Sequence, residues 1–129
     1  MKILLDTSAI IEFLKGNIKV KDVVEKSLDV YTSTLCVYEV FRGALFLEAK
    51  GYRSDLNRIR EFIGVLNVLD LKVEDVLKAS EIWSKLKLQG ITINDADVLI
   101  SAQAVNRGLT VVTKDRDFAR IGEVDAVFI

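Results

Sequence analysis

The chain has 129 residues, of which 50% are hydrophobic and 29% are charged, and this size and composition predict one globular domain over residues 1–129. The presence of one cysteine and no histidine excludes an internal disulfide, a histidine-ligated zinc site and a Ser-His-Asp triad. If the chain binds a metal, the ligands must therefore be oxygens, which hard cations such as Mg²⁺ and Mn²⁺ prefer.

Membrane insertion and export are not expected. No apolar run approaches the roughly 18 residues that a helix needs to cross a bilayer. The first acid, Asp6, follows an apolar stretch that is too short for the hydrophobic region of a signal peptide. Since the chain also has only one cysteine, we expect the protein in the cytoplasm.

The formal net charge of −1 argues at first against a nucleic-acid partner.

Strands and helices alternate along the predicted chain. In order, the elements are a strand at residues 2–5, helices at 8–15 and 20–28, a strand at 30–34, helices at 37–50 and 55–66, a strand at 67–71, helices at 76–89 and 95–107, and strands at 109–113 and 126–129. Ser54 and Asn94 are the predicted N-caps of the fourth and sixth helices, and Gly108 is predicted to end the sixth. This alternation predicts a doubly wound α/β sheet, because such strands pair in parallel through right-handed crossovers.

Two acids stand where such a sheet binds its ligands. Ligands of doubly wound sheets lie beyond the carboxyl ends of the strands, at the point where the strand order reverses. Asp6 and Asp115 follow the two clearest predicted strands, residues 2–5 and 109–113, and are therefore candidate site residues. Each also has a simple structural explanation, since Asp6 suits a helix N-cap and Asp115 suits a turn.

Two further acids lie on predicted helices. Glu39 is at the border of an apolar stripe, and Gly43, four residues on, leaves space above its carboxylate; a surface glutamate in water is the alternative explanation. Asp95 and Asp97 fall in the first turn of the helix capped by Asn94, where the helix dipole alone would stabilise acids. The apolar residues that follow predict that Asp97 points toward the strand ends and that Asp95 is turned about 200° away.

Together these positions predict a cluster of carboxylates from Asp6, Glu39, Asp97 and Asp115. Clustered carboxylates raise one another's pKa, so the arrangement is unfavourable without a cation, and bound Mg²⁺ relieves it. A pair of such ions stabilises both the attacking and the leaving oxygen in phosphodiester cleavage. If the four acids are set aside as metal ligands, 15 of the 19 acids remain against 18 bases, so the net charge does not exclude a phosphate-bearing partner.

Four segments carry a resemblance to a known family. They are ILLDTS at residues 3–8, YEVFRG at residues 38–43, DVLISA at residues 97–102 and VVTKDRDF at residues 111–118. In this order and spacing they resemble the PIN-domain ribonucleases, and most closely the VapC-type toxins of prokaryotic toxin–antitoxin pairs. The resemblance covers nearly the whole chain.

The resemblance implies a three-layer α/β domain with a central five-stranded parallel sheet flanked by helices. It implies Mg²⁺ or Mn²⁺ as cofactor, hydrolysis of single-stranded RNA, a homodimer, and a VapB-type antitoxin that blocks the site. It also assigns metal binding and catalysis to the four acids named above, and supporting roles to the hydroxyls of Ser8 and Thr113. Asp117 is a further candidate ligand, or an acid that holds local structure.

The predicted mechanism is metal-assisted hydrolysis, in which the four acids hold one or two ions and a metal-bound water attacks phosphorus. No imidazole base is available, so activation of water falls to the metal and the carboxylates. A basic stretch would either follow an RNA backbone or form a solvated helix face; it consists of Lys50, Arg53, Arg58 and Arg60.

Other functional classes fit the residues less well. A receiver domain needs an acceptor acid after a middle strand, and Asp70 follows only a doubtful one. A phosphatase of the haloacid-dehalogenase type needs an Asp-x-Asp motif, whose second acid is replaced here by Ser8. A catalytically silent interaction module would be indicated by loss of one of the four acids, and none is lost. An RNA-processing PIN nuclease outside a toxin pair stays open as an alternative.

Overall fold

The computed structural model describes residues 1–129. Its elements in chain order are β1 (Lys2–Leu5), α1 (Thr7–Leu14), α2 (Ile18–Glu25), β2 (Asp29–Ser33), α3 (Thr34–Ala49), α4 (Leu56–Gly64), β3 (Asn67–Leu69), α5 (Val73–Leu88), α6 (Asp95–Arg107), β4 (Thr110–Thr113), the 3₁₀ helix η1 (Arg116–Arg120) and β5 (Ala126–Phe128).

The strands form one parallel sheet in the order β3-β2-β1-β4-β5. The chain moves outward from β1 through β2 to β3, then returns to β4 beside β1 and continues to β5. The predicted five-stranded parallel sheet is thus confirmed, with its reversal of strand order between β1 and β4. Because Leu5 of β1 is in register with Val112 of β4, the residues after both strands emerge at the same edge of the sheet.

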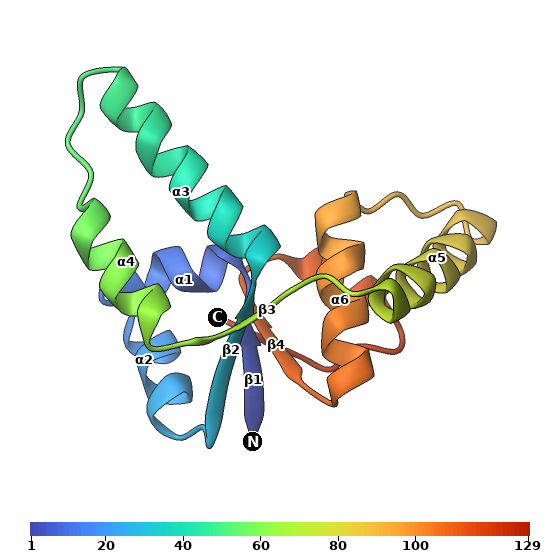
Figure 1. Cartoon of the computed structure of the whole chain (residues 1–129). Coiled ribbons are helices and arrows are strands. Elements are labelled where there is room, and N and C mark those ends of the chain that lie inside the picture. Colours follow the sequence, from blue (N-terminus) through green and yellow to red (C-terminus); the bar gives the residue numbers. More distant parts are fainter.

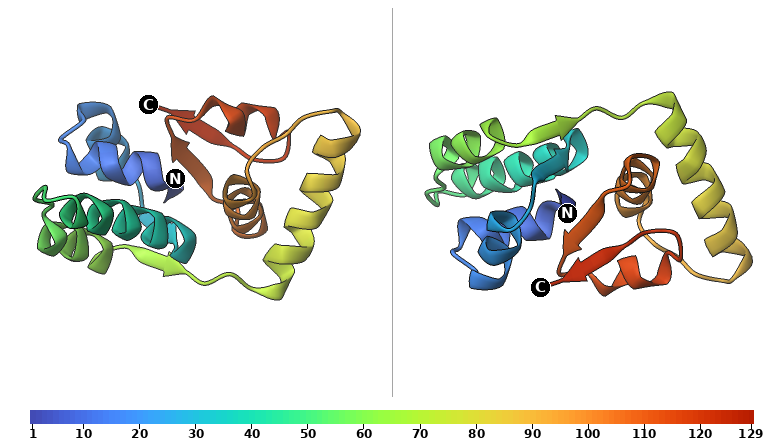
Figure 2. Two further views of the ribbon diagram at one scale, coloured as in Figure 1. Left: turned by 90° about the horizontal axis from the view of Figure 1, so that it is seen from above. Right: turned by 90° about the horizontal axis from the view of Figure 1, so that it is seen from below.

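Helices lie on both faces of the sheet and give the predicted three layers (Figure 1). The helices α1 to α4 lie on one side and α6 lies on the other, with α5 packed against the outer face of α6, as the views from above and below also show (Figure 2). The helices α3 and α4 form a hairpin that starts where β2 ends and projects beyond the sheet (Figure 1). None of the helices combines the length and the apolar character that crossing a membrane requires.

The central strands β1 and β4 form the middle of the core. Ile3, Leu4 and Leu5 have no exposed surface, and neither do Val111 and Val112. Parallel strands that are covered on both faces have continuous apolar sequences, and this pattern is what identified both strands. The polar residues at the ends of these strands, Thr113 and Asp6, are buried at the carboxyl edge of this core.

Local capping explains where several elements begin and end. The predicted caps of α6 are confirmed, since the Asn94 side chain accepts a hydrogen bond from Asp97 N–H and Gly108 adopts a left-handed conformation with φ 64°. Thr34, predicted as the last residue of a strand, begins α3 instead. The reason is that the Ser33 hydroxyl accepts a hydrogen bond from Leu35 N–H and so caps a helix at this point.

The start of α4 corrects a second prediction. Ser54 is not the N-cap; Asp55 is, and its carboxylate accepts a hydrogen bond from Arg58 N–H at 3.1 Å. The Ser54 hydroxyl donates instead to the Ala44 carbonyl of α3, also at 3.1 Å. This bond ties the segment that precedes α4 to α3.

Candidate active site

Asp6 leaves β1 and becomes the N-cap of α1. Its Oδ1 accepts hydrogen bonds from Ala9 N–H at 2.9 Å and from the Ser8 hydroxyl at 2.7 Å, and its Oδ2 accepts one from the Thr113 hydroxyl. The side chain is buried, and burial raises the pKa of Asp6 in spite of these hydrogen bonds. The N-cap role considered for Asp6 is confirmed, and the same carboxylate stands at the carboxyl edge of the sheet.

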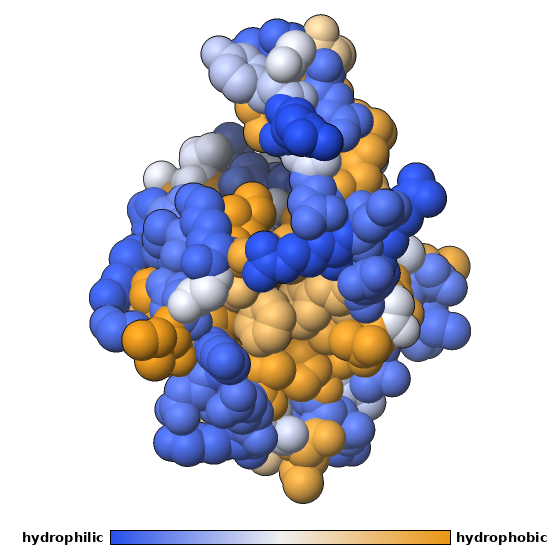
Figure 3. Space-filling model, turned by 90° about the vertical axis from the view of Figure 1, so that its left-hand side faces the viewer, coloured by the Kyte–Doolittle hydropathy of each residue, from blue (hydrophilic) through white to orange (hydrophobic).

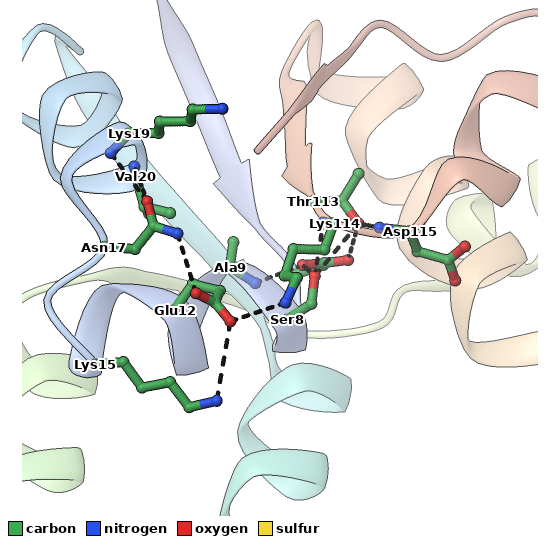
Figure 4. A network of polar contacts seen from close by, with 11 residues as sticks. Ser8, Ala9, Glu12, Lys15, Asn17, Lys19, Val20, Thr113, Lys114 and Asp115 are labelled. Atoms are coloured by element: carbon green, nitrogen blue, oxygen red, sulfur yellow. Dashed lines mark hydrogen bonds and ion pairs between the residues drawn. The ribbon is translucent and has the colours of Figure 1, made fainter.

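The hydroxyls of Ser8 and Thr113 join the ends of β1 and β4 (Figure 4). The Thr113 hydroxyl accepts a hydrogen bond from Asp115 N–H at 2.9 Å, and the Ser8 hydroxyl accepts one from Lys114 N–H at 2.9 Å. Because each hydroxyl also donates to Asp6, they fix the loop after β4 against the start of α1. These are the two residues predicted to support the acids, and the structure places both beside Asp6.

Asp97 lies in the first turn of α6 and is 9% exposed. Its Oδ2 accepts a hydrogen bond from the Asn94 side-chain amide at 2.9 Å. Burial, followed by the negative charges of Asp115 and Asp6, raises the pKa of Asp97 to about 7. Asp97 is therefore close to both other acids. Asp95 is exposed and lines a groove between α5 and α6, so it faces away from the cluster, as predicted.

Glu39 approaches the cluster from α3. Its Oε1 accepts a hydrogen bond from the Thr7 hydroxyl at 2.8 Å, and its Oε2 lies 3.6 Å from the Arg42 guanidinium. Apart from the neighbouring backbone of α3 itself, nothing lies within 4 Å of the position that a Cβ on Gly43 would take. This space belongs to a groove of about 370 Å³ between α1, α3 and α4, on the side of the molecule where hydrophobic surface is bordered by hydrophilic residues (Figure 3).

Thr7 was not among the predicted site residues. It follows Asp6 directly and begins α1, so a hydroxyl next to the first acid was the only signal for it in the sequence. Its partner Glu39 is 32 positions away. The contact depends on how α1 packs against α3, which local sequence patterns do not describe.

Asp117 makes local contacts within η1. Its N–H donates to Asp115 Oδ1 at 2.9 Å, and its carboxylate lies 3.7 Å from the Arg120 guanidinium. The first contact caps the 3₁₀ helix with the Asp115 side chain, and the second pairs residues on successive turns. These interactions fit an acid that holds local structure.

The predicted basic stretch occupies the α3–α4 hairpin, and all of its members are exposed: Lys50, Arg53, Arg58 and Arg60. Lys50 and Arg53 lie near the loop of the hairpin, the end far from the sheet (Figure 1). Arg58 lines the groove that also contains Glu39. Of the four basic residues, Arg58 is therefore the one that shares a groove with a predicted site acid.

The donor atoms of this site suit a hard cation. Asp6, Asp97 and Asp115 bring negative charge together at one edge of the sheet, and Glu39 borders them through Thr7. The only thiol, Cys36, is buried and burial raises its pKa to about 12, so it offers no thiolate. No three of the acids are arranged as a ready-made coordination site, so a cation would have to draw the carboxylates inward.

The comparison of this chain with protein families identifies the family to which it belongs. The family model described as PIN domain matches residues 3–124. The chain belongs to the PIN-domain family. The matched part of this PIN domain includes Asp6, Glu39, Asp97 and Asp115.

Individual relatives of this PIN domain are similar over the whole chain. Ribonuclease VapC1 of Rickettsia felis is 26% identical over 131 residues, which cover 100% of this chain and 97% of the relative. The structure is similar to DNA-bound VapBC from Salmonella typhimurium, with a TM-score of 0.83, 25% identity, and coverage of 99% of this chain and 98% of the other. It shares its fold with VapBC2 from Rickettsia felis bound to a promoter DNA fragment, with a TM-score of 0.83, 18% identity, and coverage of 100% and 99%.

Proposed function

We propose that this PIN domain is a metal-dependent endoribonuclease that hydrolyses phosphodiester bonds of single-stranded RNA. The observation that carries this proposal is the meeting of Asp6, Asp97 and Asp115 where the strand order reverses, with Glu39 at their border. A buried acid with a pKa of about 7 among other acids is unfavourable in a purely structural role. Membership of the PIN-domain family and a relative named as a ribonuclease support the same activity.

The four acids would hold Mg²⁺ or Mn²⁺, with Asp117 as a further candidate. A bound divalent ion supplies activated water at neutral pH and offsets charge on the phosphate. The neighbouring polar groups orient the acids: Asn94 holds one oxygen of Asp97, and the Thr7 hydroxyl holds one oxygen of Glu39. The other oxygen of Glu39 lies 3.6 Å from the Arg42 guanidinium, so a cation bound by Glu39 would share or replace this ion pair.

We also propose that the enzyme is the toxin of a VapBC-type pair and acts as one domain over residues 1–129 in the cytoplasm. The similar solved structures named VapBC support a VapB-type antitoxin as its partner. A homodimer is the assembly that the family resemblance implies. Growth arrest on expression, relieved by the product of a short adjacent gene, is the result expected for a toxin. Expression without growth arrest would favour an RNA-processing enzyme of the same family.

Cleavage of RNA tests the activity directly. A 5′-labelled single-stranded RNA of mixed sequence is expected to be cut in Mg²⁺ or Mn²⁺ and to remain intact in EDTA, because the acids act through a bound cation. The same strand annealed into a duplex serves as the control for single-strand preference. Intact RNA in both ions over a range of sequences would contradict the proposal and favour an interaction module.

Metal binding is expected to stabilise the fold, since a cation offsets the repulsion among the acids. At a concentration about 100 times its Kd, an ion that binds only the folded state stabilises it by about 2.7 kcal/mol. For a domain of this size, the corresponding rise in Tm is on the order of 10 °C. Differential scanning calorimetry in Mg²⁺, in Mn²⁺ and in NaCl of equal ionic strength measures it, and equal Tm values in all three would contradict the assigned site.

The same rise in Tm is expected to depend on pH. Because the pKa of Asp97 is raised to about 7, a proton competes with a cation for this carboxyl group near neutral pH. The Mg²⁺-dependent rise is therefore expected to be larger at pH 8 than at pH 6. A rise that is equal at both values would show that protonation of Asp97 does not compete with the metal.

A further inference from the structure

A second polar network begins beside the acids and extends along α1. The loop after β4 carries Lys114 between Thr113 and Asp115. Its backbone N–H is held by the Ser8 hydroxyl, and its side chain crosses to α1, where Nζ lies 3.0 Å from Glu12 Oε1 (Figure 4). From the other side, Lys15 Nζ lies 3.9 Å from the same oxygen. Two ammonium groups are thus gathered on one carboxylate oxygen.

Glu12 is fixed in place as the anchor of this network. The Asn17 side-chain amide donates to its other oxygen, Oε2, at 3.0 Å, and the carboxylate side chain is only 14% exposed. Hydrogen bonds from Asn17 and then from Lys114 hold the pKa of Glu12 below its ordinary value, so Glu12 is negatively charged at neutral pH. Asn17 is itself held as the N-cap of α2. Glu12 therefore has a fixed partner, Asn17, in addition to the two exposed lysine side chains.

The two lysines remain open to a further partner. Their side chains are 53% exposed for Lys114 and 69% exposed for Lys15. Each ammonium group has three donors. The hydrogen bond to Glu12 uses one donor of Lys114, and Lys15, at 3.9 Å, forms an ion pair without a hydrogen bond. Exposed ion pairs contribute only about 0–1 kcal/mol to stability. Stability of the fold is thus a weak reason for this arrangement, and an incoming anion can share the ammonium groups without breaking it.

The lysines border the acid cluster itself. A hollow of about 330 Å³ is lined by Ser8, Ile11, Glu12, Lys15, Lys114 and Asp115. Ser8 and Glu12 are four residues apart on α1, about 6 Å along the helix axis. The positive rim therefore starts next to Asp115 and continues away from the acids along one face of α1. A polyanion whose reacting phosphate lies at the acids would place a neighbouring phosphate within reach of this rim.

We propose that Lys114 and Lys15, held by Glu12, form a subsite for an RNA phosphate adjacent to the one that is cleaved. This rests on the proposed function, because it takes the acid cluster as the place of cleavage. Lys114 and Lys15 are binding residues in this arrangement and Glu12 is a positioning residue. The subsite reads the backbone and not the bases, so it raises affinity for single-stranded RNA of any sequence.

Binding of a 5′-labelled single-stranded RNA, measured by fluorescence anisotropy in EDTA at several salt concentrations, tests the subsite without cleavage. For single strands, the slope of log affinity against log salt becomes shallower by about 0.7 for each phosphate that the protein no longer neutralises. The double variant K15Q/K114Q is expected to show this change. Raising the salt concentration from 50 to 200 mM should therefore weaken RNA binding by the double variant about threefold less than it weakens binding by the parent. K21Q, which removes an exposed lysine of α2, is the matched control and should keep the parent slope.

Two further measurements test whether the charge of the lysines is what binds RNA, and whether the subsite acts on binding or on cleavage. K114R keeps the positive charge and is expected to keep the parent slope. In Mg²⁺, the double variant is expected to raise KM with little change in kcat, because the acids are untouched. A lysine-dependent slope in a protein that cuts no RNA would overturn the proposed activity and leave the subsite. Cleavage with the same slope and KM in parent and double variant, or no salt-dependent RNA binding by the parent, would overturn the subsite.

Discussion

Asp97→Asn is expected to lower RNA cleavage by at least about 100-fold while the fold stays intact. Residues that merely support a metal ligand change activity by about 10–100-fold when they are replaced, and a ligand itself should cost no less. Asparagine has the same shape but carries no charge, so it removes an anionic ligand from the centre of the cluster. It also removes the cost of burying a charge beside other acids, which raises the pKa of Asp97 to about 7. The Tm of the variant in EDTA should therefore be no lower than that of the parent.

Asp95→Asn is the matched control for this variant. Asp95 lies in the same first turn of α6, makes the same kind of dipole interaction, and faces away from the acids. We expect Asp95→Asn to cleave RNA at the rate of the parent and to show the same rise of Tm in Mg²⁺. We expect neither result for Asp97→Asn. Initial rates of cleavage and calorimetric scans measure both quantities. Equal cleavage by the two variants would show that the assignment of Asp97 is wrong.

Arg107→Ala is expected to destabilise the fold by about 3–5 kcal/mol, because it leaves a buried charge without its partner. Asp75 on α5 has no exposed surface, and Arg107 on α6 donates to both of its oxygens, at 2.7 and 3.0 Å. Two further donors are Asn106, at 2.9 Å, and the N–H of Lys72, at 3.0 Å. A loss of this size is a large part of the roughly 5–15 kcal/mol that typically stabilises a domain. Urea denaturation at pH 7 measures it.

An exposed ion pair provides the control for Arg107→Ala. Lys85 Nζ lies 3.0 Å from Glu123, and Lys85 is mostly exposed, so Lys85→Ala should change the free energy of unfolding by less than about 1 kcal/mol. The two variants each remove one cation from an ion pair that α5 makes with a later segment. A loss below about 1 kcal/mol for Arg107→Ala as well would contradict the importance of the buried pair.

The same pair gives the parent a defined dependence on acid. Burial opposes ionisation of Asp75, but hydrogen bonds from Arg107, Asn106 and Lys72 outweigh it and hold the pKa at about 2, against an ordinary value of 3.8. A lowered pKa in the folded state means that the contribution of Asp75 to stability is complete above about pH 5 and is lost as the pH falls toward 2. Because Arg107→Ala removes the strongest of these donors, its unfolding free energy should fall less over this range.

The buried pair also connects stability to the site. Asp75 and Arg107 join α5 to α6, and α6 carries Asp97 in its first turn. The pair lies at the opposite end of α6 from Asp97, so it holds the helix without contacting the acids. Loss of the pair should therefore lower cleavage only because fewer molecules are folded. The activity of each folded molecule should stay near that of the parent.

Local patterns in the sequence determined most of the elements and the candidate acids. Asn94 and Gly108 define the ends of α6 through hydrogen bonding and a left-handed conformation that depend on a few neighbouring residues. The continuous apolar sequences of β1 and β4 identified two buried strands, and Asp6 and Asp115 follow them. Such signals act within one or two turns or along one strand, which is why they are readable without a structure.

Tertiary packing alone decided how these pieces act together. Thr113 and Asp6 are 107 positions apart, and their hydrogen bond exists because β4 returns to pair with β1. In the sequence, Asp75 is an ordinary acid just before the helix predicted at residues 76–89, and only the packing of α5 on α6 buries it against Arg107. The sequence determined which acids stand at the ends of strands and helices. Strand order and helix packing decided which of these acids lie together in one charged site. Contacts between distant residues leave no periodic trace, so no local pattern predicts them.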